Sequence, residues 1–309
     1  MNPLDLPKEF LLVWWGVMGL FVGSFLNVVI HRYPYDRETV HRPRRSRCPQ
    51  CRKELGWREN IPLLSWLIQR GRCSGCRWPI PFRYPLVEAL NAALWLYVGW
   101  RCLPEQWPLA LVWSLVASSL LVTTFVDFDH LEIPDWVSIG GMLCAPVLSA
   151  LVPELHRGGL CVQWIDGTAE GVPSRMAAVT NSLAGIATGA GVLWAIGVLG
   201  SRAFGKDAMG FGDVKLLGAG GGLIGPIGAL VALMVASLIG SVMGVGNILR
   251  WLCFLRRRVA QRSARRGWLA SCRAARVMGQ YLPFGPALAM GILVVLCEWS
   301  WLAAWWPVP

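Results

Sequence analysis

The sequence is poor in charged residues. Asp, Glu, Lys and Arg make up 15% of its 309 residues, whereas 55% are hydrophobic. Soluble domains usually contain about 25% charged residues, so the composition excludes an ordinary soluble globular protein. Tryptophan (18 residues) and glycine (34 residues) are abundant, and membrane proteins favour both. The composition therefore predicts an all-α polytopic membrane protein.

The sequence also lacks the short motifs of two large hydrolase classes. It contains neither the HExxH motif of zinc metalloproteases nor the GxSxG motif of serine hydrolases. Its four histidines, His31, His41, His130 and His156, are scattered. Residues 220–225 match GxGxxG, but they follow no strand-like segment and lie in an apolar run. Close helix packing by small residues explains them better than a dinucleotide site.

The positive charge is concentrated in two segments. Of 29 Lys and Arg residues, 13 lie in residues 31–83 and 9 lie in residues 250–280. An excess of Lys and Arg is typical of cytoplasmic loops. The distribution therefore predicts an inner-membrane protein with these loops in the cytoplasm, and it gives no support to nucleic-acid binding. The arginine-rich stretch 255–276 predicts a surface helix that contacts anionic membrane lipid.

The apolar runs are long enough to span a bilayer about eight times, since each span needs about 20 residues. The predicted spans are 10–30, 85–102, 108–127, 136–152, 179–200, 214–228, 229–249 and 282–304. Glycines and Pro226 interrupt the sixth and seventh, so this stretch is either two short spans or one broken helix.

The predicted spans divide the chain into three parts. Residues 1–30 contain the first transmembrane helix. Residues 31–84 form a cytoplasmic loop with four cysteines. Residues 85–309 form the transmembrane core, with an external loop at 153–178 and a basic cytoplasmic loop at 250–281.

Two acidic residues lie at the ends of predicted membrane spans, where a charged group is energetically unfavourable. Asp127 and Asp213 fall at the cytoplasmic ends of the third and sixth predicted spans. Ionisable groups inside a membrane are usually functional. Two carboxylates close together do not both ionise readily, so one keeps a proton while the other stays charged. Such a pair can activate a water molecule and polarise a peptide carbonyl. We therefore interpret Asp127 and Asp213 as candidate catalytic residues.

The neighbouring polar residues have simpler interpretations. Asp135 follows Pro134 at a predicted helix start, where negative charge is favoured. Asp129 is either structural or a partner of the catalytic pair. His130 either influences Asp127 or is an ordinary interfacial residue.

The basic loop contains two CxxC pairs separated by 21 residues. The four cysteines are Cys48, Cys51, Cys73 and Cys76. Two CxxC pairs at about this spacing are typical of a structural zinc site with four thiolate ligands. We therefore predict a zinc-binding cytoplasmic loop.

Several motifs occur in an ordered series between about residues 21 and 294. They are residues 23–32 (GSFLNVVIHR), the CxxC pairs, 83–88 (RYPLVE), 127–135 (DFDHLEIPD), 210–215 (GFGDVK) and 282–286 (LPFGP). In order and spacing they resemble the bacterial type IV prepilin leader peptidases, also called prepilin peptidase/N-methyltransferases.

The resemblance implies an activity and roles for particular residues. It implies that Asp127 and Asp213 are the catalytic aspartates, the second in a GxGD motif, and that the four cysteines bind zinc. Members of the family cleave prepilins or type II secretion pseudopilins after a glycine that ends a short basic leader. They then methylate the new N-terminus with S-adenosyl-L-methionine. The binding site for this cofactor is not assigned.

Two other interpretations stay open. The first is a proton-coupled membrane transporter or scaffold with structural zinc, but the external halves of the spans show no series of acids. The second is a presenilin-like intramembrane aspartyl protease. That group shares GxGD and lacks the four-cysteine loop.

Overall fold

The structure, a computed structural model, describes residues 6–34, 39–40, 42–43, 45–157, 159–167, 171–205, 209–260 and 283–305. Within these ranges every regular element is a helix, and strand-like pairing is limited to three isolated bridges between residues 39 and 79. This confirms the predicted all-α class. Most of the arginine-rich stretch lies outside the described residues.

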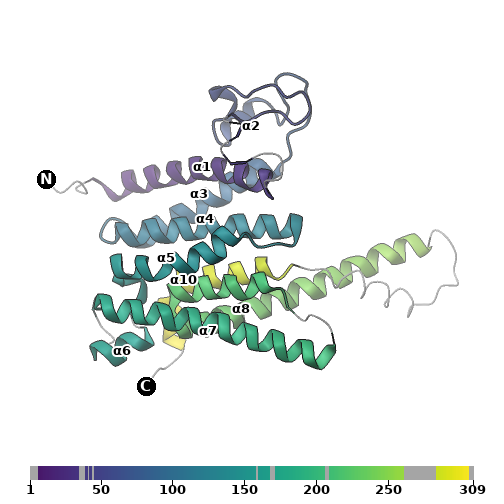
Figure 1. Cartoon of the computed structure of the whole chain (residues 1–309). Coiled ribbons are helices and arrows are strands. Elements are labelled where there is room, and N and C mark those ends of the chain that lie inside the picture. Colours follow the sequence, from purple (N-terminus) through teal and green to yellow (C-terminus); the bar gives the residue numbers. More distant parts are fainter. Residues whose placement is uncertain are drawn as a thin grey trace.

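The long helices lie side by side and form a bundle (Figure 1). They are α1 (Lys8–Arg32), α3 (Arg83–Cys102), α4 (Trp107–His130), α5 (Asp135–Leu151), α7 (Arg175–Phe204), α8 (Phe211–Ala260) and α10 (Gly285–Trp305). The short helices η1 (Trp57–Glu59) and α2 (Leu64–Ile68) belong to the cysteine-containing loop, and η2 (Pro153–His156) and α6 (Leu160–Asp166) to the loop before α7.

Four helices are long and apolar enough to cross a membrane: α1, α4, α7 and residues 211–250 of α8. The predicted spans 136–152 and 282–304 correspond to shorter apolar helices, Asp135–Leu151 and Gly285–Glu298. The predicted span 85–102 forms α3, which is less apolar because it carries Glu88 and Asn91, both buried. Each predicted span thus corresponds to a helix or part of one, but not every one of these helices is long and apolar enough by itself to cross a membrane.

Helix α8 consists of two helices that meet at Gly225, where the backbone leaves helical geometry (φ 76°, ψ 177°) and a proline follows. The first half begins near Phe284, at the start of α10, and Gly220 lies against Ile292, farther along α10. The second half returns toward the start of α10, where Gly240 lies against Phe284. The chain therefore reverses at Gly225, as two short antiparallel segments would.

Glycines let α7 and the first half of α8 approach until their backbones touch. A Cβ atom added to Gly185 of α7 would lie 2.0 Å from the Gly221 carbonyl oxygen, and one added to Gly189 would lie 2.5 Å from the Leu217 carbonyl oxygen. The glycines of the GxGxxG stretch therefore serve helix packing, as predicted, because small residues allow membrane helices to pack closely.

This packing makes Gly185 intolerant of a side chain. We expect Gly185→Ala to lower the free energy of unfolding in detergent by about 1–3 kcal/mol, because the methyl group must displace backbone. Gly191→Ala is the matched control, since nothing lies within 4 Å of a Cβ atom there. It should be neutral or stabilising, because alanine favours helix. Equal stability of the two variants, measured by thermal unfolding, would contradict this packing.

Candidate active site and cysteine cluster

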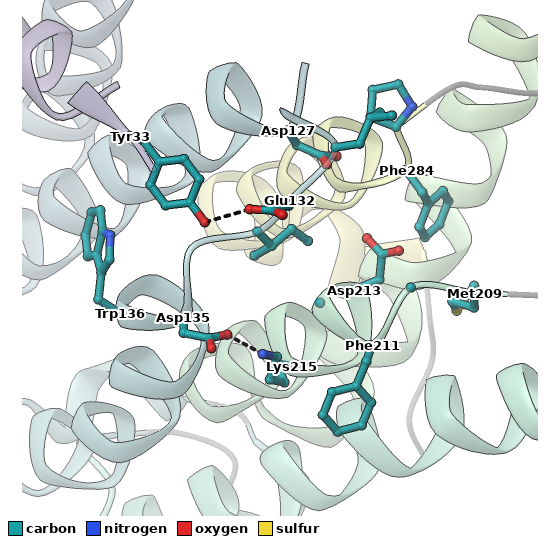
Figure 2. Close-up of a pocket in the computed structure, with 15 residues that line it drawn as sticks. Tyr33, Asp127, Glu132, Asp135, Trp136, Met209, Phe211, Asp213, Lys215 and Phe284 are labelled. Carbon is teal, nitrogen blue, oxygen red and sulfur yellow. Dashed lines mark hydrogen bonds and ion pairs between the residues drawn. The ribbon is translucent and has the colours of Figure 1, made fainter. Parts of the chain in front are cut away.

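Asp127 and Asp213 line one cavity at one end of the bundle. Asp127 lies in the last turn of α4, and Asp213 lies in the first turn of α8. The cavity has a volume of about 890 Å³, and both carboxylates face into it (Figure 2). Its other walls come from Tyr33, residues 131–136 except the buried Pro134, residues 209–215 except Val214, and Pro283 and Phe284. The structure thus brings together the two acids selected from the sequence.

Asp127 is held in place by the start of α10. Its side chain is buried, and it accepts a hydrogen bond from the backbone N–H of Gly285. A Cβ atom on residue 285 would lie 2.5 Å from Oδ2 of Asp127. Only glycine therefore allows the backbone to approach this carboxylate so closely. Gly285 is the glycine of the LPFGP motif, and the sequence alone offered no reason to assign it a role.

Asp213 is positioned by the glycines that precede it. Its backbone N–H donates to the Gly210 carbonyl oxygen (3.2 Å), and Gly212 lies against Ile133 across the cavity wall. A Cβ atom on Gly210 would lie 3.3 Å from Oδ2 of Asp213. Gly210 thus lets the backbone approach this carboxylate, and Gly212 lets the start of α8 pack against the α4–α5 loop.

The neighbouring aspartates are each paired with a cation. Asp129 accepts a hydrogen bond from Nη1 of Arg83 (2.5 Å), which ties α4 to the start of α3. Asp135, the first residue of α5, pairs with Lys215 of α8 (Figure 2). Asp135 therefore does more than begin a helix, because it joins two walls of the cavity.

Two further polar residues at the cavity were not found from the sequence. Glu132 lines the cavity and accepts a hydrogen bond from the Tyr33 hydroxyl (3.2 Å), which connects the end of α1 to the α4–α5 loop. The ring of Tyr33 also lies 5.7 Å from that of His130. His130 thus packs on an aromatic ring at the helix end, as an interfacial residue does.

The four cysteines of the CxxC pairs come together. The Sγ atoms of Cys48 and Cys76 are 3.8 Å apart, those of Cys51 and Cys73 are 4.0 Å apart, and all four lie within 4.8 Å of one another. Four thiolates bound tetrahedrally to zinc at 2.3 Å would be separated by about 3.8 Å. The spacing therefore fits a metal ion with four sulfur ligands.

The two CxxC pairs form matching turns. In each turn a residue just after the second cysteine has positive φ (Arg52, 56°; Arg77, 60°) and donates its backbone N–H to the carbonyl oxygen of the first cysteine. Backbone N–H groups of Cys76 and Gly75 lower the pKa of Cys73 to about 6. In this turn the backbone N–H groups favour the thiolate form of Cys73, which is the form that binds zinc.

The two turns are also connected by polar contacts. Lys53 donates hydrogen bonds to Glu59 (2.9 Å) and to Ser74 (2.7 Å). Hydrogen bonds from Lys53, Ser74 and the Gly56 backbone lower the pKa of Glu59 to about 2. This charged contact fixes one CxxC turn against the other.

The fold and site define a multi-pass helical membrane protein with two carboxylates from different helices in one cavity. Comparison with known families agrees with this class. Residues 17–102 match the bacterial peptidase A24 N-terminal domain, and residues 114–245 match the type IV leader peptidase family. No solved structure matches the chain.

Individual relatives carry names of the same family. The chain is 40% identical to the prepilin leader peptidase/N-methyltransferase of Myxococcus xanthus, over 74% of this chain and 61% of that protein. It is 36% identical to the enzyme of the same name from Aeromonas hydrophila (75% and 80%), and 32% identical to that from Pseudomonas aeruginosa (94% and 88%). The chain belongs to the type IV leader peptidase family.

Proposed function

We propose that the chain is a membrane aspartic endopeptidase. It cleaves the basic leader from type IV prepilins or type II secretion pseudopilins after a glycine, and then methylates the new N-terminus with S-adenosyl-L-methionine as methyl donor. The observation that carries the proposal is the presence of Asp127 and Asp213 in one cavity, on two helices of the bundle. The names of the relatives support the substrate and the second activity.

The two aspartates have complementary roles in this proposal. One carboxylate is ionised and takes a proton from a water molecule, which then attacks the scissile carbonyl carbon. The other is protonated and donates a hydrogen bond to the carbonyl oxygen as negative charge develops there. Because two nearby carboxylates do not both ionise readily, the pair supplies both states at once.

The position of the cavity suits a substrate with a polar leader and an apolar helix. Both aspartates lie at helix ends on the side of the bundle that carries the cysteine-containing loop (Figure 1). The excess of Lys and Arg in that loop supports a cytoplasmic location in an inner-membrane protein, by the positive-inside rule. A leader held in the cytoplasm and a helix in the bilayer would then place the scissile bond at the depth of the two acids.

Zinc has a structural role in this proposal. Cys48, Cys51, Cys73 and Cys76 would hold it, and four sulfur ligands leave no open position for a catalytic water. The metal would fix the two CxxC turns against each other, as the hydrogen bond from Lys53 to Ser74 also does.

We expect Asp127→Asn and Asp213→Asn each to lower the turnover number by about 10³-fold or more, because each removes one of the two proton-transfer groups. The measurement is cleavage of a synthetic prepilin by the purified protein in detergent. Thermal unfolding of the same samples tests whether the fold is intact.

Asp129→Asn is the matched control, since Asp129 is two residues from Asp127 but pairs with Arg83. It should retain cleavage within about tenfold of wild type, because exposed ion pairs contribute little. Normal processing by either of the first two variants would sink the catalytic assignment.

Gly285→Ala should lower the turnover number by about 10²-fold, because a methyl group there forces the Asp127 carboxylate out of position. The same prepilin assay measures this. Gly244→Ala is the control, since nothing lies within 4 Å of a Cβ atom at that position. If both alanine variants cleave alike, the Gly285 backbone does not hold Asp127.

Removal of one zinc ligand should remove the metal. We expect wild-type protein to contain one zinc ion per chain by elemental analysis, and Cys73→Ser to contain almost none, because a structural site needs all four ligands. Cys144→Ser, at an exposed cysteine of α5, is the control and should retain zinc. Full zinc content in Cys73→Ser would refute the site.

A further inference from the structure

The cysteine lobe, residues 45–82, presents a large apolar surface for a segment expected to lie in water. Leu67 and Ile68 of helix α2 are 62% and 70% exposed. Leu64 of the same helix is half exposed, and positions 64, 67 and 68 share one helical face. Other exposed apolar side chains of the lobe are Trp57, Trp78 and Phe82. A contiguous exposed apolar face of this kind usually contacts a partner or a membrane.

The opposite face of α2 is already occupied. The Trp66 ring lies 5.8 Å from that of Phe82 and its Nε1–H donates to the Ile80 carbonyl oxygen (3.2 Å). Trp66 also lies against Gly71. Helix α2 therefore has one face packed on the lobe, while Leu64, Leu67 and Ile68 point away from it.

A hydrogen bond to the buried residue Glu88 sets the depth of α2 relative to the bundle. The backbone N–H of Leu63, directly before α2, donates to Oε2 of Glu88 in α3 (2.8 Å). Glu88 is five residues beyond the start of α3, which is about 7.5 Å along the helix axis. Gly23 of α1 lies against Glu88 and is nine residues before the end of that helix, about 13.5 Å along its axis.

Helix α2 therefore does not begin beyond the end of the bundle. It begins beside the first turns of α3 and the last turns of α1. Figure 1 shows the lobe beside these helix ends rather than beyond the end of the bundle. In a bilayer spanned by α1, whose length and composition suit a membrane span, the last turns of the helix would cross the interfacial layer. The exposed face of α2 would then lie at the level of lipid.

The charges around this face complement an anionic lipid surface. Arg70 is exposed and follows α2 by two residues, and Arg58 lies over the Trp57 ring (5.0 Å). Arginines with an adjacent tryptophan and leucines are typical of segments that lie in a membrane interface. Each basic residue near an anionic leaflet adds to this attraction.

We propose that helix α2 inserts Leu64, Leu67 and Ile68 into the leaflet on the aspartate side of the membrane, while Arg58 and Arg70 bind anionic phospholipid headgroups. The cysteine lobe then lies in the membrane interface and is not surrounded by water on all sides. The occupant of this face is lipid, and the proposal does not depend on the peptidase activity.

Site-directed photocrosslinking tests the proposal on the full chain. The photoreactive residue p-benzoylphenylalanine replaces Leu67 or Ile68, and the zinc-loaded protein is reconstituted in vesicles of phosphatidylethanolamine and phosphatidylglycerol. Gln50, exposed within the first CxxC turn, carries the probe in the matched control. Mass spectrometry then identifies the molecules attached to each variant. Zinc content and thermal unfolding select variants whose lobe is intact.

We expect lipid adducts at positions 67 and 68 in several-fold higher yield than at position 50. Equal yields at the three positions would overturn the proposal, and so would attachment to a second polypeptide in place of lipid. Phosphatidylglycerol should be enriched among the adducts relative to its share of the vesicle. The double variant Arg58→Glu/Arg70→Glu should remove that enrichment. An unchanged enrichment would exclude these arginines as headgroup ligands.

Discussion

Backbone contact between α7 and the first half of α8 is the constraint on which the site depends. Gly185 meets Gly221 with no space for a side chain, and this fixes the helix that carries Asp213 in its first turn. The reversal at Gly225 brings the second half of α8 back beside α10. Helix α10 then begins at Gly285, next to Asp127. The two carboxylates face one cavity because glycine lets these helices touch.

The other buried polar groups of the bundle are hydrogen-bonded to one another or to the backbone. Asn91 donates to the Gly19 carbonyl oxygen (2.7 Å) and accepts from Ser118, which also accepts from Trp95. Among the described residues, no buried side-chain nitrogen or oxygen lacks a hydrogen-bond partner. Burying a polar group away from water without a hydrogen-bond partner is energetically unfavourable. The bundle thus satisfies its structural polar groups internally.

The acids near the cavity differ in their partners. Arg83 pairs with Asp129 and Lys215 pairs with Asp135, so each of these carboxylates has a cation of its own. The Asp127 carboxylate accepts a backbone N–H and faces the cavity instead. A pair of carboxylates that face one cavity is the arrangement that the proposed hydrolysis by two aspartates uses.

Features that depend on local pattern could be predicted from the sequence. Apolar length and basic loops predicted the helices, and the position of Asp127 and Asp213 at the cytoplasmic ends of two predicted spans indicated that they could lie at one depth. The spacing of the cysteines predicted their cluster, and the structure brings all four sulfur atoms together. Composition, helix length and ligand spacing are enough to account for each of these features.

Contacts between distant segments could not be predicted in this way. The hydrogen bond of Leu63 to Glu88 and that of Tyr33 to Glu132 join residues with no shared motif. The glycines of α8 left a broken helix and two short spans as equal alternatives, because the direction of the chain after Gly225 depends on where α10 lies. Tertiary packing decides both cases.

The most direct test of the account is the structure of this protein bound to a prepilin-like peptide in which a hydroxyl-bearing transition-state isostere replaces the scissile bond. The account predicts that the isostere hydroxyl lies between Asp127 and Asp213, within hydrogen-bond distance of both carboxylates. A peptide bound outside this cavity, or carboxylates too far apart to contact one hydroxyl, would contradict it.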